Sequence, residues 1–228
     1  MNDSTVPTPG VPTPEYKLQD NLAYMFKDPN WVSKILLGAL IGIVPILNFA
    51  TAGYAVQTTR NIRDDQDPLP GWSGSMGKFF MEGLKLFVIG FLYSIPIWIL
   101  SLILIPLFGS GKGAAVALGV LIGLVELAFV LLLVFWFQGV IVNFANKGTI
   151  GSGFAIGAIW GIIQENMGRM LVTLGVAFLA MIIVGIVGGI LQIIPCLGQI
   201  AAWLLTFAAS FYILLVFAYN CGFIAKSS

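Results

Sequence analysis

The chain has 228 residues, of which 58% are hydrophobic and only 9% are charged, and its formal net charge is +1. Soluble domains carry about 25% charged residues, so this composition excludes an ordinary soluble fold. The near-neutral charge gives no basic field for nucleic acid, and a chain without histidine lacks the commonest catalytic base and metal ligand. Its cysteines, Cys196 and Cys221, have no metal-binding spacing. We therefore expect a membrane protein without a metal or another cofactor.

The N-terminal part of the chain is polar. Residues 1–16 are rich in proline and lack the basic start and apolar core of a cleavable signal, so we expect a disordered or polyproline-type arm. Residues 17–28 carry apolar side chains at helical spacing, which predicts a short interfacial helix on the membrane surface. We expect residues 17–228 to form a single helical membrane domain.

The first apolar run covers residues 32–57. It is about long enough to cross a bilayer, but Pro45 interrupts it and Asn48 follows. Residues 58–78 come next and contain several aspartates and prolines, which preclude a membrane span. They are expected to form a cytoplasmic loop.

Longer apolar runs follow that loop. The predicted spans cover residues 79–108, 114–142, 170–194 and 200–224. A run of about 29 residues makes a helix of about 43 Å, which exceeds the roughly 30 Å hydrocarbon core. The first two of these helices must therefore tilt, kink or project. The mixed segment 143–169 could contain a second interfacial helix.

The distribution of Lys and Arg suggests the topology, because positive charge marks the cytoplasmic face. Basic residues stand on both sides of 32–57. If this segment enters the membrane and turns back near Pro45, ten of the eleven Lys and Arg residues are cytoplasmic and only Lys112 is outside. If it crosses as a fifth span, the split is seven to four. We prefer an all-α polytopic bundle of four spans in two hairpins, with a re-entrant N-terminal segment and both termini in the cytoplasm.

Several short motifs in residues 27–100 resemble those of one membrane-protein family. They are Asp28-Pro29-Asn30-Trp31, Pro45-Ile46-Leu47-Asn48, Gly53-Tyr54, Arg60-Asn61, Leu69-Pro70-Gly71-Trp72 and Gly83-Leu84-Lys85, with Tyr93 further on. The family is the uncharacterised prokaryotic domain of unknown function 4013. The resemblance implies the cytoplasmic membrane of a bacterium or archaeon and brings no activity or catalytic residue. This chain has Gly71 where the family often has an acidic residue.

Glu126 is the one charged residue well inside a predicted span. A bare carboxylate there costs several kcal/mol, so the group should be protonated or paired. One interpretation is an ion or proton site. The other is a structural side chain, hydrogen-bonded to Thr173, to Gln192 or to a partner subunit. Asn48, in the broken first run, completes the set of candidate intramembrane polar residues.

Glycines spaced four apart suggest close helix contacts. The pairs are Gly38/Gly42, Gly119/Gly123 and Gly185/Gly189. They predict packing within the chain or, alternatively, an oligomer face.

The loop 58–78 offers Arg60, Arg63 and Trp72 as candidate contacts for a cytoplasmic partner or for lipid phosphates. The alternative is a solvated connector stiffened by proline. We predict no metal site in this loop, because it lacks the glycine turn and distal glutamate of a calcium loop.

Two functions from different classes fit these patterns. The first is a non-catalytic assembly, scaffold or accessory subunit that contacts the lipid bilayer and either itself or another membrane protein. The second is a small transporter or channel that uses Glu126. An enzyme is not expected, since no nucleotide-binding loop, nucleophile elbow or zinc-binding motif is present in the sequence.

Overall fold

The computed structural model describes residues 17–227, and this part of the chain contains helices and no strand. The predicted N-terminal arm, residues 1–16, lies outside the described residues. The α-helices are α1 (Leu18–Ala23), α2 (Trp31–Ile43), α3 (Asn48–Arg63), α4 (Met76–Gly109), α5 (Gly113–Lys147), α6 (Ile156–Leu191) and α7 (Leu197–Ser227). Two 3₁₀ helices, Tyr24–Lys27 and Ile150–Phe154, complete the set. The predicted all-α class is confirmed.

Helices α4, α5, α6 and α7 are long and apolar enough to cross a membrane, with mean hydropathies between 2.2 and 2.8. They contain 34, 35, 36 and 31 residues. At 1.5 Å per residue the shortest is about 46 Å long, which exceeds the roughly 30 Å hydrocarbon core. Each must therefore tilt or extend beyond the core.

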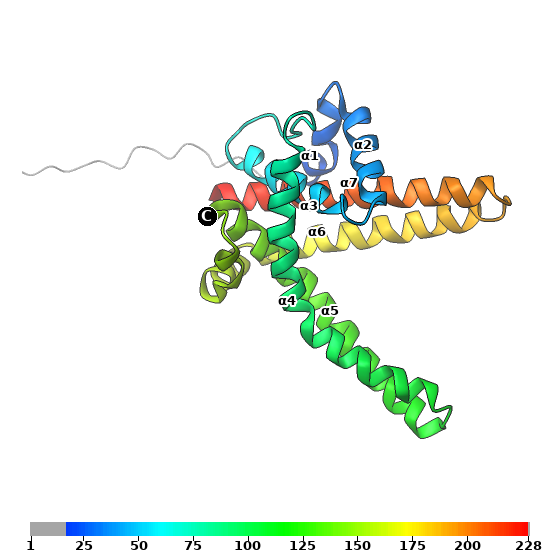
Figure 1. Ribbon diagram of the computed structural model, residues 1–228. Helices are drawn as coiled ribbons and strands as arrows, with labels where there is room; N and C mark the ends of the chain where they lie inside the picture. The colour runs from blue at the N-terminus through cyan, green and yellow to red at the C-terminus, as the bar shows by residue number, and fades with distance from the viewer. Residues whose placement is uncertain (1–16, 228) are drawn as a thin grey trace, which may run out of the picture.

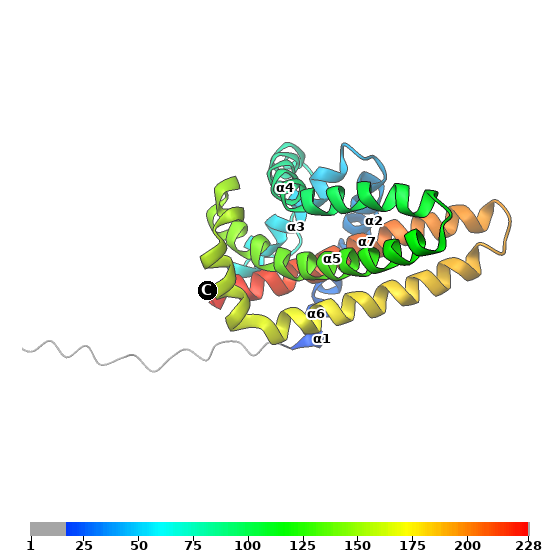
Figure 2. The same cartoon turned by 90° about the horizontal axis from the view of Figure 1, so that it is seen from below.

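These helices form two hairpins that diverge from a common base, which consists of α1 to α3, the loop between α3 and α4, and the inner ends of α4 to α7 packed with them (Figure 1). In Figure 1 the α4–α5 hairpin extends downward and the α6–α7 hairpin extends to the right. We call them the first arm (α4–α5) and the second arm (α6–α7). Figure 2 shows that both arms extend to the same side of the base. The turns at their outer ends use left-handed backbone at Gly111 (φ 65°) and Cys196 (φ 62°).

The proline-broken first run folds as two short helices. Helix α2 ends at Ile43 and α3 begins at Asn48, so the break lies around Pro45. The 13 residues of α2 span about 20 Å, which is too short to cross a bilayer. Both helices pack against α7, and α3 also packs against α4. Re-entry of this segment stays a prediction.

Helices α3 and α4 touch backbone to backbone at two glycines. A Cβ atom at Gly53 would lie 1.7 Å from the carbonyl oxygen of Phe79, and one at Gly83 would lie 1.7 Å from that of Phe49. No side chain fits either place, so glycine sets the distance between these helices.

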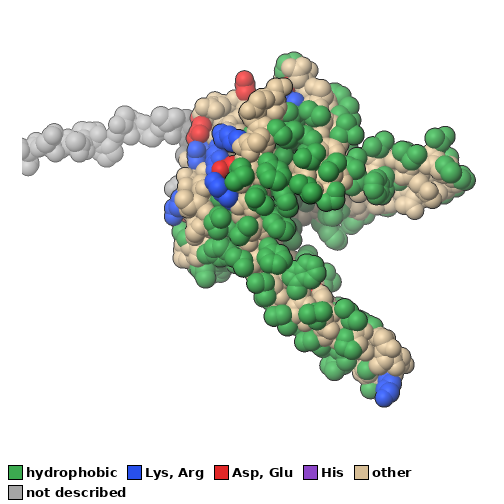
Figure 3. All heavy atoms as spheres, viewed as in Figure 1, with side chains coloured by type: hydrophobic (Ala, Val, Ile, Leu, Met, Phe, Trp, Pro, Cys, Tyr) green, Lys and Arg blue, Asp and Glu red, His purple; other side chains and the backbone are tan. Residues whose placement is uncertain are grey.

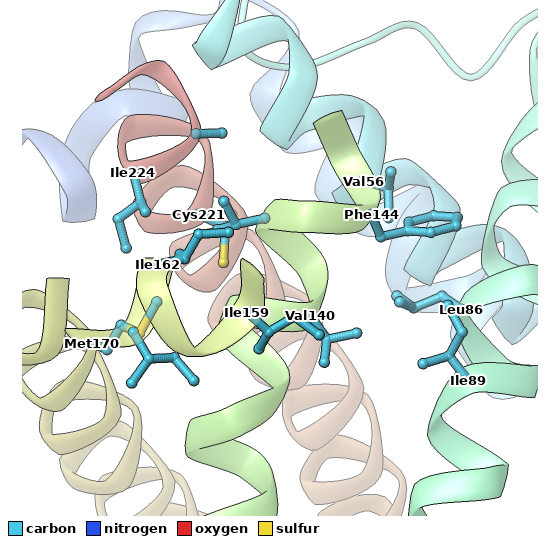
Figure 4. Close-up of a cluster of buried hydrophobic side chains, with 13 residues drawn as sticks. Val56, Leu86, Ile89, Val140, Phe144, Ile159, Ile162, Met170, Cys221 and Ile224 are labelled. Carbon is cyan, nitrogen blue, oxygen red and sulfur yellow. The ribbon is translucent and has the colours of Figure 1, made fainter. Parts of the chain in front are cut away.

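The apolar core lies in the base. Figure 4 shows one cluster, to which α3 to α7 contribute Val56, Leu86, Phe144, Ile159, Cys221 and Ile224 among others. A second cluster gathers Tyr24, Tyr54, Trp72, Phe79 and Phe211. In the arms, by contrast, large apolar side chains are exposed on the outside, as lipid-facing residues are (Figure 3).

One detail of the sequence-based description differs from the structure. Helix α6 begins at Ile156 and continues to Leu191, so the second interfacial helix is wrong as a separate element. Its residues continue into the span because no proline or left-handed residue separates them. The left-handed Gly148 (φ 70°) instead ends α5 upstream. Pro96 and Pro106 lie inside α4 without ending it.

Candidate functional site

A cluster of ionic contacts joins three elements of the base. Arg60 of α3 donates a hydrogen bond to Glu82 of α4 at 2.7 Å, and Lys85 donates to the same carboxylate at 3.0 Å. The Arg60 Nε also donates to the carbonyl oxygen of Ala145 near the end of α5, at 3.0 Å. The side chains of Arg60 and Glu82 are only 16% and 14% exposed. This cluster therefore connects α3, α4 and α5.

The loop between α3 and α4 folds back onto the base through a second set of contacts. Trp72 is 6% exposed, stacks on Tyr54 with 4.3 Å between ring centroids, and donates its indole N–H to the carbonyl oxygen of Lys34. Lys34 in turn pairs with Asp28 and donates to the carbonyl oxygen of Leu69. The loop is thus attached to α2 and α3.

These contacts correct the predicted roles of the loop residues. Trp72 is buried, so it is not an exposed contact for lipid or a partner, and Arg60 makes its bonds inside the protein. Arg63 is more exposed, at 25%, and donates to Asp64 and to the carbonyl oxygen of Ala145. The hydrogen bond from Arg63 lowers the pKa of Asp64 below its ordinary value. Among residues 17–227, no three Cys, Asp or Glu side chains gather where they could hold a metal ion.

Glu126 has a partner that the sequence does not identify. It accepts a hydrogen bond from the hydroxyl of Ser101, at 2.6 Å, across the first arm. Thr173, one of its predicted partners, is fully buried and donates to the carbonyl oxygen of Arg169 in its own helix. Gln192 lies at the end of α6, on the second arm. Among residues 17–227 the predicted pairing of Glu126 with Thr173 or Gln192 is therefore not found.

The predicted glycine pairs have different surroundings. A Cβ atom at Gly38 would lie 2.3 Å from the ring of Phe211, so this glycine packs inside the chain. A Cβ atom at Gly119 would lie 3.2 Å from the ring of Phe108, across the first arm. A Cβ atom at Gly123, Gly185 or Gly189 would meet no atom of another element within 4 Å. These three remain open for contact with another molecule, whereas Gly42 lies beside Asn48 and Phe207.

Three neighbouring hollows line the second arm and the base. The first, of about 600 Å³, lies between α6 and α7 and is lined by Gly185, Gly189, Gln192, Gln199, Trp203, Thr206 and Ser210 among others. The second, of about 280 Å³, shares Thr206 and Ser210 with it and reaches Asn48 and Thr51 at the start of α3. The third, of about 530 Å³, shares Asn48 and Thr51 with the second and adds Ser94 and Trp98 of α4.

These hollows form one surface, which we call the inter-arm groove. It runs from the outer end of the second arm to the start of α3 and then onto α4. Asn48 and Gln192, two of the four predicted intramembrane polar residues, line different hollows of this groove, while Glu126 lies on the first arm and Thr173 inside the protein. The space between the arms is visible in Figure 3.

The structure also reveals buried amides that the sequence-based search overlooked. Gln138 of α5 donates to the carbonyl oxygen of Met170 at 3.3 Å and accepts from Asn220 of α7 at 3.4 Å. Asn143 donates to the carbonyl oxygen of Ser152 at 2.7 Å. A sequence signal was present for Gln138 and Asn220, because these amides stand inside the predicted apolar runs 114–142 and 200–224. They lie where the arms meet and hold α5, α6 and α7 together.

Comparison with known proteins gives one match. The model of a family described as a protein of unknown function (DUF4013) matches residues 36–193. That range includes the whole of α3, α4, α5 and α6 and most of α2. No curated protein and no solved structure matches the chain significantly.

Proposed function

The chain belongs to the DUF4013 family, whose function is unknown, and from this premise we propose that it is a non-catalytic assembly subunit of a prokaryotic cytoplasmic membrane. It would act as a scaffold or accessory protein and bind a second copy of itself or another membrane protein through the space between its arms.

The separation of the two arms is the observation that carries this proposal. Beyond the base, each arm is only two helices thick. Polar side chains such as Gln192, Thr206 and Ser210 line the hollow between the two helices of the second arm. A bilayer offers such groups no water, so they are stabilised by hydrogen bonds to protein. The open glycines Gly185 and Gly189 leave room for a helix to approach closely.

The distribution of charge supports a role without catalysis. Glu82 pairs with Arg60 and Lys85, and Asp65 pairs with Lys226 at the other side of the base. Carboxylates held in this way stabilise the fold rather than accept protons from a substrate. The ion pairs attach the loop and the C-terminal helix to the base.

The same distribution supports a cytoplasmic base. Lys112 lies in the outer turn of the first arm, and the other Lys and Arg residues lie outside the two outer turns. In Figure 3 positive and negative side chains gather on the base, and one positive group lies at the end of the first arm. Because Lys and Arg favour the cytoplasmic side, we propose that the base and both termini face the cytoplasm.

Co-purification tests the assembly proposal. The tagged chain is extracted from its own membrane in a mild detergent, and the purified material is examined by native mass spectrometry. We expect the chain at a fixed stoichiometry with a second polypeptide, identical or different. A sample extracted with a harsh detergent is the control, in which the stoichiometric complex should be lost.

A small transporter or channel is the second candidate, and the Ser101–Glu126 pair favours it. A carboxyl that exchanges a proton or cation inside the membrane is typical of ion-coupled transport. This function requires an ionisable group at position 126. It would be supported if proteoliposomes carry a solute or ion and Glu126→Gln abolishes that flux.

A further inference from the structure

The first arm presents a row of polar groups to the space between the arms. Ser94, Trp98 and Ser101 follow one another at helical spacing on one face of α4. Ser94 and Trp98 line the third hollow of the inter-arm groove together with Leu214 of α7, so this face of α4 is turned toward the second arm. Ser101 continues the row and donates to Glu126. The row therefore ends on a carboxyl group inside the membrane.

Only one oxygen of that carboxyl group is bonded. Oε1 of Glu126 accepts from Ser101, while within residues 17–227 no hydrogen bond is found for Oε2. The side chain is half-buried, and Oε2 is not among the buried polar atoms that lack a partner, so this oxygen is partly exposed at the surface of the arm. A polar atom in hydrocarbon is stabilised when a donor from another helix reaches it.

The second arm carries a matching row on α7. Thr206 and Ser210 stand one helical turn apart and line the groove. The Thr206 hydroxyl donates to the carbonyl oxygen of Ala202 in its own helix. In the described part of the chain the exposed Ser210 hydroxyl makes no hydrogen bond, and neither do the side-chain amides of Gln192 and Gln199. The second arm therefore carries hydrogen-bond donors and acceptors, on Gln192, Gln199 and Ser210, that have no partner in the described part of the chain.

Glu126 and Ser210 lie at the same distance from the outer ends of their arms. Glu126 is 14 residues beyond Lys112 in the first outer turn (126 − 112), and Ser210 is 14 residues beyond Cys196 in the second (210 − 196). At 1.5 Å per residue, both are about 21 Å from their turns. If both turns lie at one membrane surface, the two residues share one depth. They do not meet within one chain, because the arms diverge (Figure 1).

We propose that a second copy of this chain occupies the space between the arms, with its second arm packed against the first arm of its neighbour. A two-fold axis along the membrane normal leaves the depth of every residue unchanged, so groups at equal depth can meet across it. Ser210 of each copy would then donate to Glu126 of the other, in an isologous interface with two equivalent contacts. The inference rests on the proposed assembly function and names its partner.

A second copy fits this space better than lipid does. Acyl chains offer no hydrogen bonds to Glu126, Ser210 or Gln192, whereas the second arm of another copy supplies hydroxyls and amides at the required depth. The glycines of the second arm also leave room for another helix to approach closely, since nothing lies within 4 Å of a Cβ atom at Gly185, Gly188 or Gly189.

Disulfide trapping between two chains, each with one introduced cysteine, tests the arrangement. Ser101→Cys and Ser210→Cys are placed on separate chains that carry different tags, in a Cys196→Ser background that retains the buried Cys221. The chains are co-expressed and oxidised in native membranes. A disulfide between the two tags can form only between copies. Ile103→Cys, two residues along α4 and 46% exposed on its opposite face, replaces Ser101→Cys in the matched control.

We expect a disulfide-linked heterodimer with Ser101→Cys and Ser210→Cys and none with Ile103→Cys. Glu126→Leu should weaken dimerisation in lipid about three- to twentyfold per contact, as for other interhelical hydrogen bonds. Glu126→Gln, which keeps an acceptor, should stay near the wild type. Absence of the Ser101–Ser210 link, or equal linking by Ile103→Cys, would overturn the proposed arrangement. If the chain then purifies with a different protein, the assembly function survives without the second copy. A lone chain with lipid contradicts both.

Discussion

The Ser101 hydroxyl donates a hydrogen bond to the Glu126 carboxyl at 2.6 Å, and this contact joins the two helices of the first arm in its outer half. A carboxyl group without a partner would be costly inside a bilayer. One hydroxyl satisfies one of its oxygens, and the other oxygen is left for a neighbouring molecule. The contact therefore has a structural role within the chain and, in our account, a role between chains.

Removing the Ser101 hydroxyl should weaken the first arm. We expect Ser101→Ala to lower the free energy of unfolding by about 0.6 kcal/mol and by no more than about 1.7 kcal/mol, the range of interhelical hydrogen bonds in membranes. The measurement is reversible unfolding in mixed detergent micelles. Ser110→Ala is the control, because that hydroxyl, in the turn after α4, donates to the carbonyl oxygen of Leu107 only three residues earlier. Equal stability of the two variants would contradict a structural role for the contact.

The backbone contact between α3 and α4 gives a sharper prediction. Gly83→Ala places a methyl group against the carbonyl oxygen of Phe49, so the helices must separate. We expect a loss of about 1–3 kcal/mol or more, as for other overpacked sites. Gly77→Ala in the same helix is the control, since nothing lies within 4 Å of its Cβ position. Fluorescence-detected gel filtration after heating compares the two, and a Gly83→Ala protein as stable as the control would refute the contact.

The ionic cluster in the base should matter more than an exposed charge does. Arg60→Ala removes bonds to Glu82 and to the carbonyl oxygen of Ala145, both in a poorly exposed place. Hydrogen bonds to charged groups contribute about 1.5–3 kcal/mol, so we expect a loss of that order. Lys78→Ala removes an exposed basic residue for which no ion pair is found among residues 17–227. Melting temperatures that fall equally in both variants would show that the cluster adds nothing.

The part of the fold that depends on local sequence could be predicted, whereas the part that depends on tertiary contacts could not. The long apolar runs specify the four spans, and Pro45 breaks the first run because its ring removes a backbone donor. Pro96 and Pro106 have the same chemistry yet remain inside α4, because the surrounding span continues as helix. A proline alone therefore does not decide between a break and a continuous helix.

The candidate site was less predictable. Glu126 is recognisable from hydrophobicity alone, but its partner depends on which face of α4 meets α5, and spacing does not give that register. Trp72 stands in a polar, proline-rich loop that suggests exposure. It is buried because Leu69 and Trp72 attach that loop to Lys34 on one side, and Trp72 stacks on Tyr54 on the other. These contacts span more than 15 residues of sequence and follow from the tertiary fold.

Cysteine labelling tests the orientation of the chain. Cys196 is exposed in the outer turn of the second arm, whereas Cys221 is buried. A membrane-impermeant maleimide on intact cells should therefore label Cys196. Absence of labelling at Cys221 does not show on which side of the membrane this residue lies, because burial alone protects its thiol from the reagent.

An introduced cysteine supplies the missing half of that experiment. Ser73 is exposed in the loop of the base, so Ser73→Cys in a Cys196→Ser background should label only after the cells are opened. Ser110→Cys in the outer turn of the first arm is the matched control and should label in intact cells. Labelling of Ser73→Cys but not of Ser110→Cys in intact cells would reverse the proposed orientation.

The most direct test of the assembly account is the composition of the particle taken from its membrane with its own lipids. The tagged chain is excised by an amphipathic polymer, without detergent, and the mass of single particles is measured together with their protein content. The account predicts at least two polypeptides in each particle, filling the space between the arms. Particles that contain a single chain of 24.5 kDa and lipid alone would contradict it.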